Sequence, residues 1–333
     1  MLLIPNRNHD PALNLAMEEY ILTGMGLDEP VLFFYVNDPS IIIGRHQNTS
    51  DEINTDYVRE KGIRIVRRCS GGGAVYHDNG NLNYSLIRPG AAKSGTDFAI
   101  LLEPILTALH GLGLPAELGG RNDLLINGAK FSGNAYYHNR AGSVTHGTLL
   151  FDSDLSVLSL ALRPNPLKLK AKGIRSVRSR VCCIKEFLPS IGKIGDLEDA
   201  VIAQFSKRET VSTRNFSADD INKYMQLADQ RYRNDLWTFG ESPAFTFRRL
   251  ISQPGGWIDF RADIRENMII NARFFGDFFC PQDIINLESA LAGIRWTENS
   301  LSETLRISSW ENYFPEYPLE SFIRDLFSAT ANG

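Results

Sequence analysis

Cysteine is scarce in this 333-residue chain, and the four that are present form no C-x-x-C pair. They are Cys69, Cys182, Cys183 and Cys280. This spacing predicts neither a zinc site nor a disulfide framework, so reduced thiols in a cytoplasmic protein are expected. Long apolar runs are also missing, because none approaches the roughly 20 residues that cross a bilayer. The apolar opening, Met1 to Pro5, is too short for a signal peptide, so we expect no membrane association.

Neither sign of charge is in large excess. The chain has 35 lysines and arginines against 39 aspartates and glutamates, for a net charge of -4. This balance gives no whole-protein attraction to nucleic acid or to an anionic membrane, so any anion site must come from local clustering. Hydrophobic residues at 43% and charged residues at 22% are ordinary for a globular protein, and the length predicts about two domains.

Hydrophobic periodicity and turn residues predict strands and helices mixed along the chain without regular β-α alternation. Strands are expected at residues 31–36, 40–44, 63–68, 81–87, 123–126, 129–137 and 144–151. Helices are expected at residues 12–22, 54–61, 97–112, 196–207 and 218–232, with one more ending at residue 162. Beyond a boundary near residues 240–247, we expect a β-hairpin of residues 255–264 and 267–275, then helices at 281–292, 303–312 and 319–327. The pattern predicts an α+β fold, with one domain at residues 1–242 and a smaller α+β domain at 243–333.

The strongest functional signal is the segment RRCSGGGAVYHD at residues 67–78. Three consecutive glycines after a strand let backbone N–H groups approach a ligand, and such turns suit phosphate oxygens. Arg67 and Arg68 alternate across the strand end, so only one of them can point into a given site. The segment is neither a Walker A loop nor a dinucleotide-binding fingerprint. A flexible hairpin loop is the alternative.

A second segment, GRNDLLINGAKFSG at residues 120–133, contains a turn dipeptide followed by a lysine. Asn127-Gly128 predicts a hairpin turn, which puts Lys130 on the next strand with Ser132 on the same face. A lysine in a partly desolvated pocket can bridge a carboxylate and a phosphate. An ordinary exposed lysine is the alternative.

Residues 168–180 contain six lysines and arginines and no acid. Three interpretations compete: a loop that closes over a nucleotide, a nucleic-acid patch and a solvated loop. The stretch contains no aromatic residue, which weakens the nucleic-acid interpretation. His77 and His146 lack the spacing of helical zinc sites, so structural histidines are expected. Glu18 and Glu19 are expected to be an acidic pair or a polar edge on a buried helix.

Seven segments together resemble the lipoate–protein ligase family, in the family's order and with similar spacing. They are NLAMEE at 14–19, IIIGRHQN at 41–48, RRCSGGGAVYHDNGNLNYS at 67–85, GRNDLLI at 120–126, KFSGNAY at 130–136, HGTLL at 146–150 and KGIRSVRSRV at 172–181. The resemblance implies a biotin/lipoate ligase-type catalytic domain on a mixed sheet. The tail resembles the small C-terminal domain of the long bacterial members. One departure is Cys69, where a small hydroxyl residue is expected.

The resemblance also implies which residues bind the substrates. Those expected to contact ATP or the adenylate are Arg68, Gly73, Ala74, Val75, Tyr76, Lys130, Lys172, Gly173, Ser176, Val177 and Arg178. Those expected to contact lipoate are Cys69, Ser70, Gly71, Gly72, Lys130, Ser132, Gly133, His146 and Gly147. Lys130 is the expected catalytic residue, in contact with both the lipoate carboxylate and the α-phosphate. Asp123 is expected to be a Mg²⁺ ligand or a positioning residue.

The activity that the resemblance implies is a two-step ligation that uses ATP and Mg²⁺. Lipoate becomes lipoyl-AMP with release of pyrophosphate, and a carrier lysine then displaces AMP. The implied acceptors are lipoyl domains of 2-oxoacid dehydrogenase E2 subunits and the glycine cleavage H protein. We expect a monomer without a nucleic-acid partner, and the sequence leaves open whether octanoate competes with lipoate. The rivals are an octanoyl or lipoyl transferase and a biotin ligase of the same fold, and a non-catalytic regulator that binds lipoyl ligands or nucleic acid.

Overall fold

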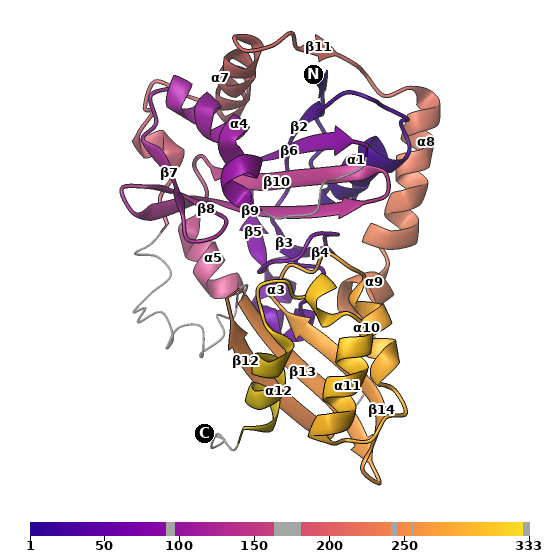
Figure 1. The fold of residues 1–333 in the computed structure, drawn as a ribbon. Helices are drawn as coiled ribbons and strands as arrows, with labels where there is room; N and C mark the ends of the chain where they lie inside the picture. Colours follow the sequence, from indigo (N-terminus) through magenta and orange to yellow (C-terminus); the bar gives the residue numbers. More distant parts are fainter. Residues whose placement is uncertain (91–96, 163–180, 241–244, 255, 329–333) are drawn as a thin grey trace. The chain divides into compact units, whose positions relative to one another are not determined.

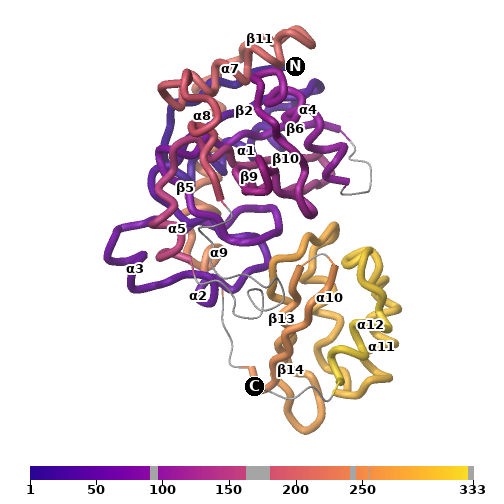
Figure 2. Tube along the Cα trace, turned by 90° about the vertical axis from the view of Figure 1, so that its left-hand side faces the viewer, coloured from indigo at the N-terminus to yellow at the C-terminus, as the bar shows by residue number. Residues whose placement is uncertain are grey.

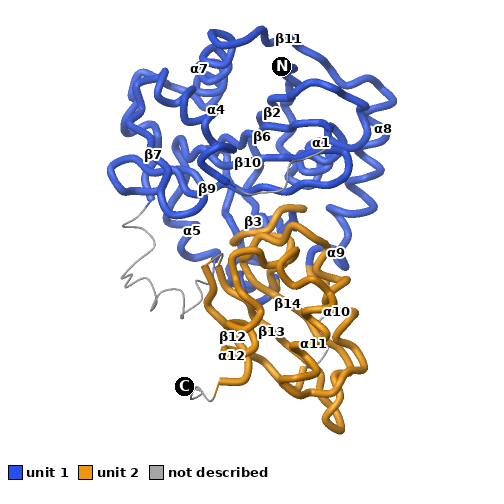
Figure 3. Tube along the Cα trace, viewed as in Figure 1, with its two compact units in different colours: residues 1–43, 49–68, 74–238 blue, residues 44–48, 69–73, 239–333 orange. Residues whose placement is uncertain are grey.

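The computed structural model describes residues 1–90, 97–162, 181–240, 245–254 and 256–328 (Figure 1). The chain divides into two compact units (Figure 3). Unit 1 contains residues 1–43, 49–68 and 74–238, and unit 2 contains residues 44–48, 69–73 and 239–333. Two short loops from early in the sequence therefore belong to the same unit as the C-terminal residues. No helix within the described ranges has the length and apolar character needed to cross a bilayer.

Unit 1 is built on a mixed sheet whose eight described strands have the order β11-β1-β2-β6-β10-β9-β8-β7. β1 is parallel to β11 and to β2, and each neighbouring pair from β2 to β7 is antiparallel. Strand β2, with the sequence VLFFYV, is β-branched and aromatic and almost wholly buried, which suits a central strand. The strands are β1 (Leu2–Ile4), β2 (Val31–Val36), β6 (Asn81–Pro89), β7 (Ala116–Gly119), β8 (Asp123–Ile126), β9 (Ala129–Asn139), β10 (Gly142–Leu150) and β11 (Ser212–Thr213).

A second sheet in unit 1 has three strands in the order β4-β3-β5. β3 (Ser40–Ile43) is parallel to β4 (Arg64–Arg67) and antiparallel to β5 (Val75–His77). The side chains of Ile41 and Ile43 are buried in a cluster with residues from the neighbouring helices. Because β4 ends just before the glycine segment and β5 begins just after it, this sheet holds both ends of that segment.

Helix α1 (Pro11–Thr23) packs on one face of the main sheet. Asp10 caps the helix by accepting from two backbone N–H groups of the first turn, and Pro11 follows it at the first helical position. The apolar side of α1 shares a buried cluster with β2, β6 and β10 that includes Met17, Tyr20, Ile21, Phe33, Tyr35, Ile87 and Val144. Further helices in the described residues before the C-terminal unit are α2 (Thr49–Glu52), α3 (Thr55–Glu60), α4 (Phe98–Gly111), α5 (Leu155–Ala161), α7 (Ile194–Ser206), α8 (Ala218–Leu227) and α9 (Asp235–Phe239).

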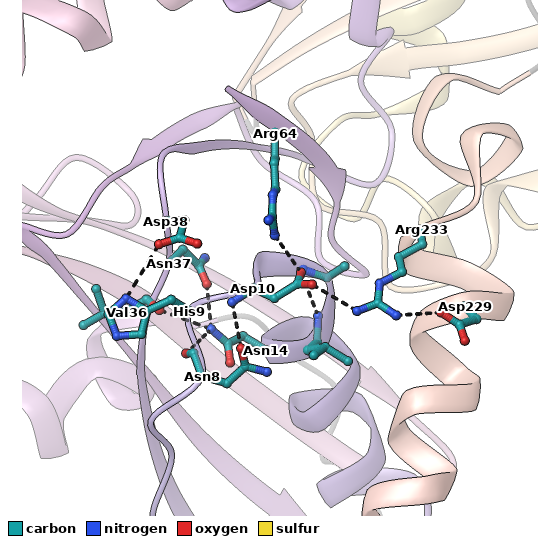
Figure 4. A network of polar contacts seen from close by, with 12 residues as sticks. Asn8, His9, Asp10, Asn14, Val36, Asn37, Asp38, Arg64, Asp229 and Arg233 are labelled. Carbon is teal, nitrogen blue, oxygen red and sulfur yellow. Dashed lines mark hydrogen bonds and ion pairs between the residues drawn. The ribbon is translucent and has the colours of Figure 1, made fainter. Parts of the chain in front are cut away.

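Asp10 also belongs to a polar network around the start of α1 (Figure 4). Arg233 Nη2 lies 3.0 Å from Asp10 Oδ2, and Arg233 Nη1 lies 2.7 Å from Asp229 Oδ1. Arg64 Nη1 lies 3.4 Å from Asp10 Oδ1. These ion pairs tie the first turn of α1 to β4 and to the chain that follows α8.

Unit 2 combines the antiparallel sheet β12-β13-β14 with three helices. Figures 1 and 2 both show α10, α11 and α12 on one side of this sheet. Its core is aromatic, with Phe260, Phe274, Trp310 and Phe322 almost fully buried. The elements are β12 (Phe247–Gln253), β13 (Gly256–Arg265), β14 (Met268–Gly276), α10 (Ile284–Leu291), α11 (Glu298–Ile307) and α12 (Leu319–Phe327).

The segment around Phe278 holds both early loops of unit 2. The His46 ring stacks on the Phe278 ring with centroids 4.8 Å apart, and His46 O accepts from Gly276 N at 2.8 Å. Gly72 N donates to Phe278 O at 3.4 Å. The C-terminal residues thus build the surroundings of the glycine segment. A division of the chain at residue 242 leaves residues 44–48 and 69–73 in the first domain, although these loops pack within unit 2.

The α+β class and the mixed sheet are confirmed, and most predicted elements are present. The helix predicted at 303–312 is misplaced, because α11 begins after Thr297, whose side chain accepts from Ser300 N. The sequence analysis missed that cap. It also missed β5 and β12: β5 has only three residues beside the glycines, and the two arginines of β12 weaken the strand pattern.

Candidate active site

Lys130 on β9 is paired with Asp123 on β8. Lys130 Nζ lies 2.7 Å from Asp123 Oδ1, and each side chain is 36% exposed. A Cβ atom at Gly133 would lie 3.0 Å from Lys130 Nζ, so the missing side chain leaves the space that the lysine occupies. The pair therefore presents an oriented, partly exposed cation rather than a freely moving surface lysine.

A β-bulge decides where Lys130 points. The register between β8 and β9 shifts so that Phe131 is an extra residue in β9. As a result, the Lys130 side chain lies on the Gly133 face of the strand. Ser132 donates to Asn134 Oδ1 at 3.2 Å and lies on the other face. The prediction that Lys130 and Ser132 share a face is wrong, because strand alternation does not hold across a bulge.

The same face of the main sheet carries a buried carboxyl–imidazole pair. His146 on β10 lies directly across from Ala135 on β9 and Ser85 on β6. His146 Nδ1 lies 2.9 and 2.8 Å from the two carboxyl oxygens of Glu18 on α1, and Ser85 Oγ donates to the same carboxyl group. Ala135 is two residues after Gly133 and therefore shares its face. A polar row thus runs from Lys130 across β10 to the buried Glu18.

The two adjacent acids of α1 have different surroundings. Glu18 is buried against the sheet, whereas Glu19 pairs with Arg231 and accepts from Tyr232 Oη at 2.7 Å. Successive helical residues point roughly 100° apart, so neighbouring acids do not share a face. The prediction of a shared acidic pair or polar edge is wrong for Glu18.

The two arginines at the end of β4 also point to different partners. Arg67 Nη2 donates to Thr238 O at 2.7 Å. Arg68 is buried; burial lowers its pKa to about 10, although the nearby Tyr35 and Glu18 raise it. Arg68 therefore lies near the buried Glu18, while Arg67 serves the packing of α9. This separation agrees with the alternation predicted at the strand end.

A chain of amides sets the tautomer of His77 on β5. Asn14 Nδ2 donates to Asn37 Oδ1 at 2.8 Å, so Asn37 turns its Nδ2 toward His77 Nδ1, 2.9 Å away (the two asparagines are shown in Figure 4). Nδ1 is thus the acceptor and Nε2 carries the hydrogen. Within the described part of the chain, His77 Nε2 is buried without a hydrogen-bond partner. Burial, followed by Arg68 and His146, lowers the pKa of His77 to about 3.

The buried, neutral His77 predicts acid sensitivity of the fold. Its pKa is about 3 in the folded protein, whereas an unfolded histidine has a pKa of about 6.5. The unfolded state therefore binds the extra proton first as the pH falls. The contribution of His77 to stability is complete above about pH 6.5 and declines below it, by roughly 2 kcal/mol at pH 5. Denaturant titrations between pH 7 and 5 should give a flatter pH dependence for His77→Gln.

The wild type is titrated under the same conditions for comparison. Equal slopes for His77→Gln and the wild type would contradict the assignment.

The glycine loop, residues 69–73, is described within unit 2. A Cβ atom at Gly71 would lie 2.3 Å from Phe278 O, and Gly72 has φ +89°, a conformation that favours glycine. Ser70 is fully buried, and its carbonyl accepts from Arg45 N at 2.8 Å. The loop is therefore closely packed within its unit, unlike the flexible hairpin considered as an alternative.

The other predicted site residues are distributed as follows. Val75 and Tyr76 lie in β5, with Ala74 just before it. Gly147 lies on β10 next to His146, on the opposite face of the sheet. The predicted adenylate contacts Lys172, Gly173, Ser176, Val177 and Arg178, and the whole basic stretch 168–180, lie outside the described residues. No group of three or more His, Cys, Asp or Glu side chains within the described ranges could hold a metal ion.

Several residues of this site were not singled out from the sequence. Ser85, Tyr35, Asn37 and Asn134 are polar or aromatic residues inside apolar strands or at their ends. One signal in the sequence could have indicated a buried polar contact: Glu18 is a charged residue on the apolar side of a helix. The strand that provides its partner, His146, could not be named without the sheet register.

Comparison with known proteins assigns the family. Residues 10–206 match the lipoyl protein ligase A/B catalytic domain, and residues 242–326 match the bacterial lipoate protein ligase C-terminus. The chain is 39% identical over 327 residues to lipoate-protein ligase LplJ of Bacillus subtilis, a match that covers 97% of this chain and 99% of the relative. A solved lipoate-protein ligase A bound with ATP has a TM-score of 0.62 at 30% identity, over 72% of this chain and 98% of that one.

A second solved structure is the bipartite lipoate protein ligase of Thermoplasma acidophilum, described with its E2 lipoyl domain. It has a TM-score of 0.63 at 30% identity and covers 74% of this chain and 98% of that one. The two matched domains and the lipoate-protein ligase relatives define an amide-forming ligase. The chain belongs to the lipoate–protein ligase family. The family resemblance found in the sequence is thereby confirmed.

Proposed function

We propose that this chain activates lipoate with ATP to form lipoyl-AMP, and that Lys130 is the residue that makes this step fast. The observation that carries the proposal is the polar row on the α1 face of the main sheet. Its Lys130–Asp123 end offers a cation to a carboxylate and a phosphate, and its Glu18–His146 end lies buried under α1.

In the first step, a lipoate oxygen attacks the α-phosphorus of ATP and pyrophosphate leaves. Both reacting groups are anions, so their approach requires neutralisation more than a covalent nucleophile. An oriented ammonium group at Lys130 supplies that neutralisation without reorganisation at the moment of reaction. Arg68 and the backbone of residues 73–76 are the further contacts that we assign to ATP and the adenylate.

Mg²⁺ is expected to arrive with the triphosphate. This ion commonly keeps several waters and takes one or two protein carboxylates together with substrate phosphates. Asp123 has one oxygen engaged by Lys130 at 2.7 Å, so at most its other oxygen suits the ion. A single protein carboxylate is consistent with a metal ion that is bound mainly by ATP. The main role that we assign to Asp123 is to position Lys130.

In the second step, the ε-amine of a carrier lysine attacks the acyl carbonyl and AMP leaves. The bipartite relative is described with an E2 lipoyl domain, which supports acceptors of that kind. We extend the proposal to the glycine cleavage H protein, to a monomer that works in the cytoplasm, and to octanoate as a competing substrate. The attacking amine must be neutral, which requires a base or local desolvation.

The nearest alternative is a transferase of the same fold, which would use a cysteine thiol and no ATP. Cys182 is the candidate because its backbone N donates to Lys130 O at 2.9 Å. Burial raises the pKa of Cys182 to about 11, so its thiol is protonated at neutral pH and nucleophilically weak. This observation favours the ligase over the transferase.

One assay tests the proposal against all its rivals. ATP–pyrophosphate exchange is measured with lipoate, octanoate or biotin in turn, and exchange with lipoate is expected. A transferase would give none, a biotin ligase would respond to biotin, and a regulator would give none but would show salt-sensitive binding to nucleic acid or plain binding of lipoate.

Asp123→Asn should separate positioning from metal binding. Without the carboxylate charge, Lys130 loses the group that orients it, and we expect the exchange rate to fall about tenfold or more. Raising the Mg²⁺ concentration should not restore it. Recovery at high Mg²⁺ would instead make Asp123 a metal ligand.

A further inference from the structure

Asn134 on β9 connects the centre of the main sheet to the start of β8. Its Oδ1 accepts from Tyr84 Oη on β6. Its Nδ2 donates to Asn122 O at 2.9 Å, its backbone N–H donates to the same oxygen at 3.1 Å, and its carbonyl accepts from Asn122 Nδ2. Asn134 is 5% exposed, so these hydrogen bonds are made away from water. The chain Tyr84–Asn134–Asn122 is therefore a buried cross-strand link.

The Tyr84–Asn134 hydrogen bond passes over Gly147. Strand β10 lies between β6 and β9, and Gly147 is directly across from Tyr84 on one side and from Asn134 on the other. A Cβ atom at Gly147 would lie 1.9 Å from Asn134 Oδ1 and 2.8 Å from Tyr84 Cε1. Any larger residue at this position would therefore displace the amide.

The link ends beside the reactive pair. Asn122 immediately precedes Asp123, the first residue of β8, which lies across from Gly133 and pairs with Lys130. Asn134 holds Asn122 by three hydrogen bonds, two through its backbone and one through its side chain, and the side-chain bond joins the Tyr84 link to the backbone that carries the Asp123 carboxylate. Lys130 is a flexible side chain beside a bulge, and its orientation depends on that carboxylate.

We infer that Asn134 is a positioning residue for Lys130, and that position 147 is glycine because the Tyr84–Asn134 hydrogen bond needs its space. The inference deepens the proposed function and rests on it, because Lys130 is the group being positioned. It gives Gly147 a different role from the lipoate contact expected from the sequence. Gly147 acts on the face of the sheet opposite Lys130, through the cross-strand link.

The test compares the full-length wild type with Asn134→Ala, Gly147→Ala and the double variant in lipoate-dependent ATP–pyrophosphate exchange. Each single variant should lower kcat about tenfold, no more than Asp123→Asn does, while the KM values for ATP and lipoate stay near those of the wild type, because the substitutions disturb the placement of Lys130 and leave the substrate contacts in place. The double variant should be no worse than Asn134→Ala, because the amide that Gly147 must clear is gone. Tyr84→Phe, which removes one donor only, should show a smaller loss.

A matched control separates positioning from loss of stability. Leu86 lies on β6 two residues after Tyr84, is 2% exposed and shares its face, so Leu86→Ala should lower Tm without lowering kcat at a temperature well below that Tm. Wild-type kcat in Asn134→Ala would overturn the inference. So would raised KM with unchanged kcat, or losses that multiply in the double variant, since these make Gly147 an independent ligand contact. The exchange rate of the wild type with lipoate tests the proposed function, and the ratio of each variant's kcat to the wild-type kcat tests this inference. If lipoate gives no exchange, the same ratios are measured with octanoate.

Discussion

Replacing Lys130 with alanine should lower the rate of lipoyl-AMP formation by about 10² to 10³-fold, the usual effect of removing one preorganised charge partner of a transition state. The ammonium group lies 2.7 Å from Asp123 and is held over the space left by Gly133. The substitution removes this cation and leaves the Asp123 carboxylate in its place, which repels both substrates. ATP–pyrophosphate exchange under saturating substrates measures the loss.

The fold should survive this substitution, because a partly exposed ion pair contributes at most about 1 kcal/mol. Lys185 provides the matched control, since it forms a similar exposed pair with Asp152 in the same unit. Lys185→Ala should keep the wild-type exchange rate, and both variants should unfold near the wild-type temperature. Full exchange activity in Lys130→Ala would refute the assignment of Lys130.

Replacing His146 with alanine should lower the free energy of unfolding by about 3 kcal/mol or more, because it orphans a buried carboxyl group. Glu18 and His146 are both buried, and the imidazole contacts both carboxyl oxygens within 2.9 Å. Ser85 would remain as a donor but cannot replace the lost ring. Equilibrium unfolding in urea measures the loss.

A double-mutant cycle identifies the cause of that loss. Glu18→Gln combined with His146→Ala should cost less than the sum of the two single losses, because both substitutions remove the same contact between the carboxyl group and the imidazole. Arg208, in an exposed pair with Glu103, serves as the surface control, and Arg208→Ala should cost at most about 1 kcal/mol. Additive losses in the cycle would mean that Glu18 and His146 do not act as a pair.

Local chemistry allowed much of the site to be predicted from the sequence. The turn at Asn127-Gly128 and the strand after it locate Lys130, and alternation at the end of β4 separates Arg67 from Arg68. Caps such as Asp10 are likewise visible, because they depend on neighbours within one helical turn. These features depend on residues close in sequence, where propensity and periodicity carry the information.

Other parts of the site depend on contacts between distant residues. The bulge at Phe131 reverses the face on which Lys130 lies, and nothing in the local sequence marks it. The pairing of Glu18 with His146 joins residues 128 positions apart through the sheet register. The tautomer of His77 results from a relay of amides that begins on α1. Such features arise only when the strand order is known.

The two units are interleaved along the polypeptide. Residues 44–48 and 69–73 leave unit 1, pack against the segment around Phe278 and return, and Gly71 approaches the Phe278 carbonyl so closely that no side chain fits. No single cut of the backbone can therefore part the units cleanly. Shortening the gene before residue 242 would remove the segment around Phe278 against which residues 44–48 and 69–73 pack, so the C-terminal portion supports two early loops of the chain and is not a detachable appendage.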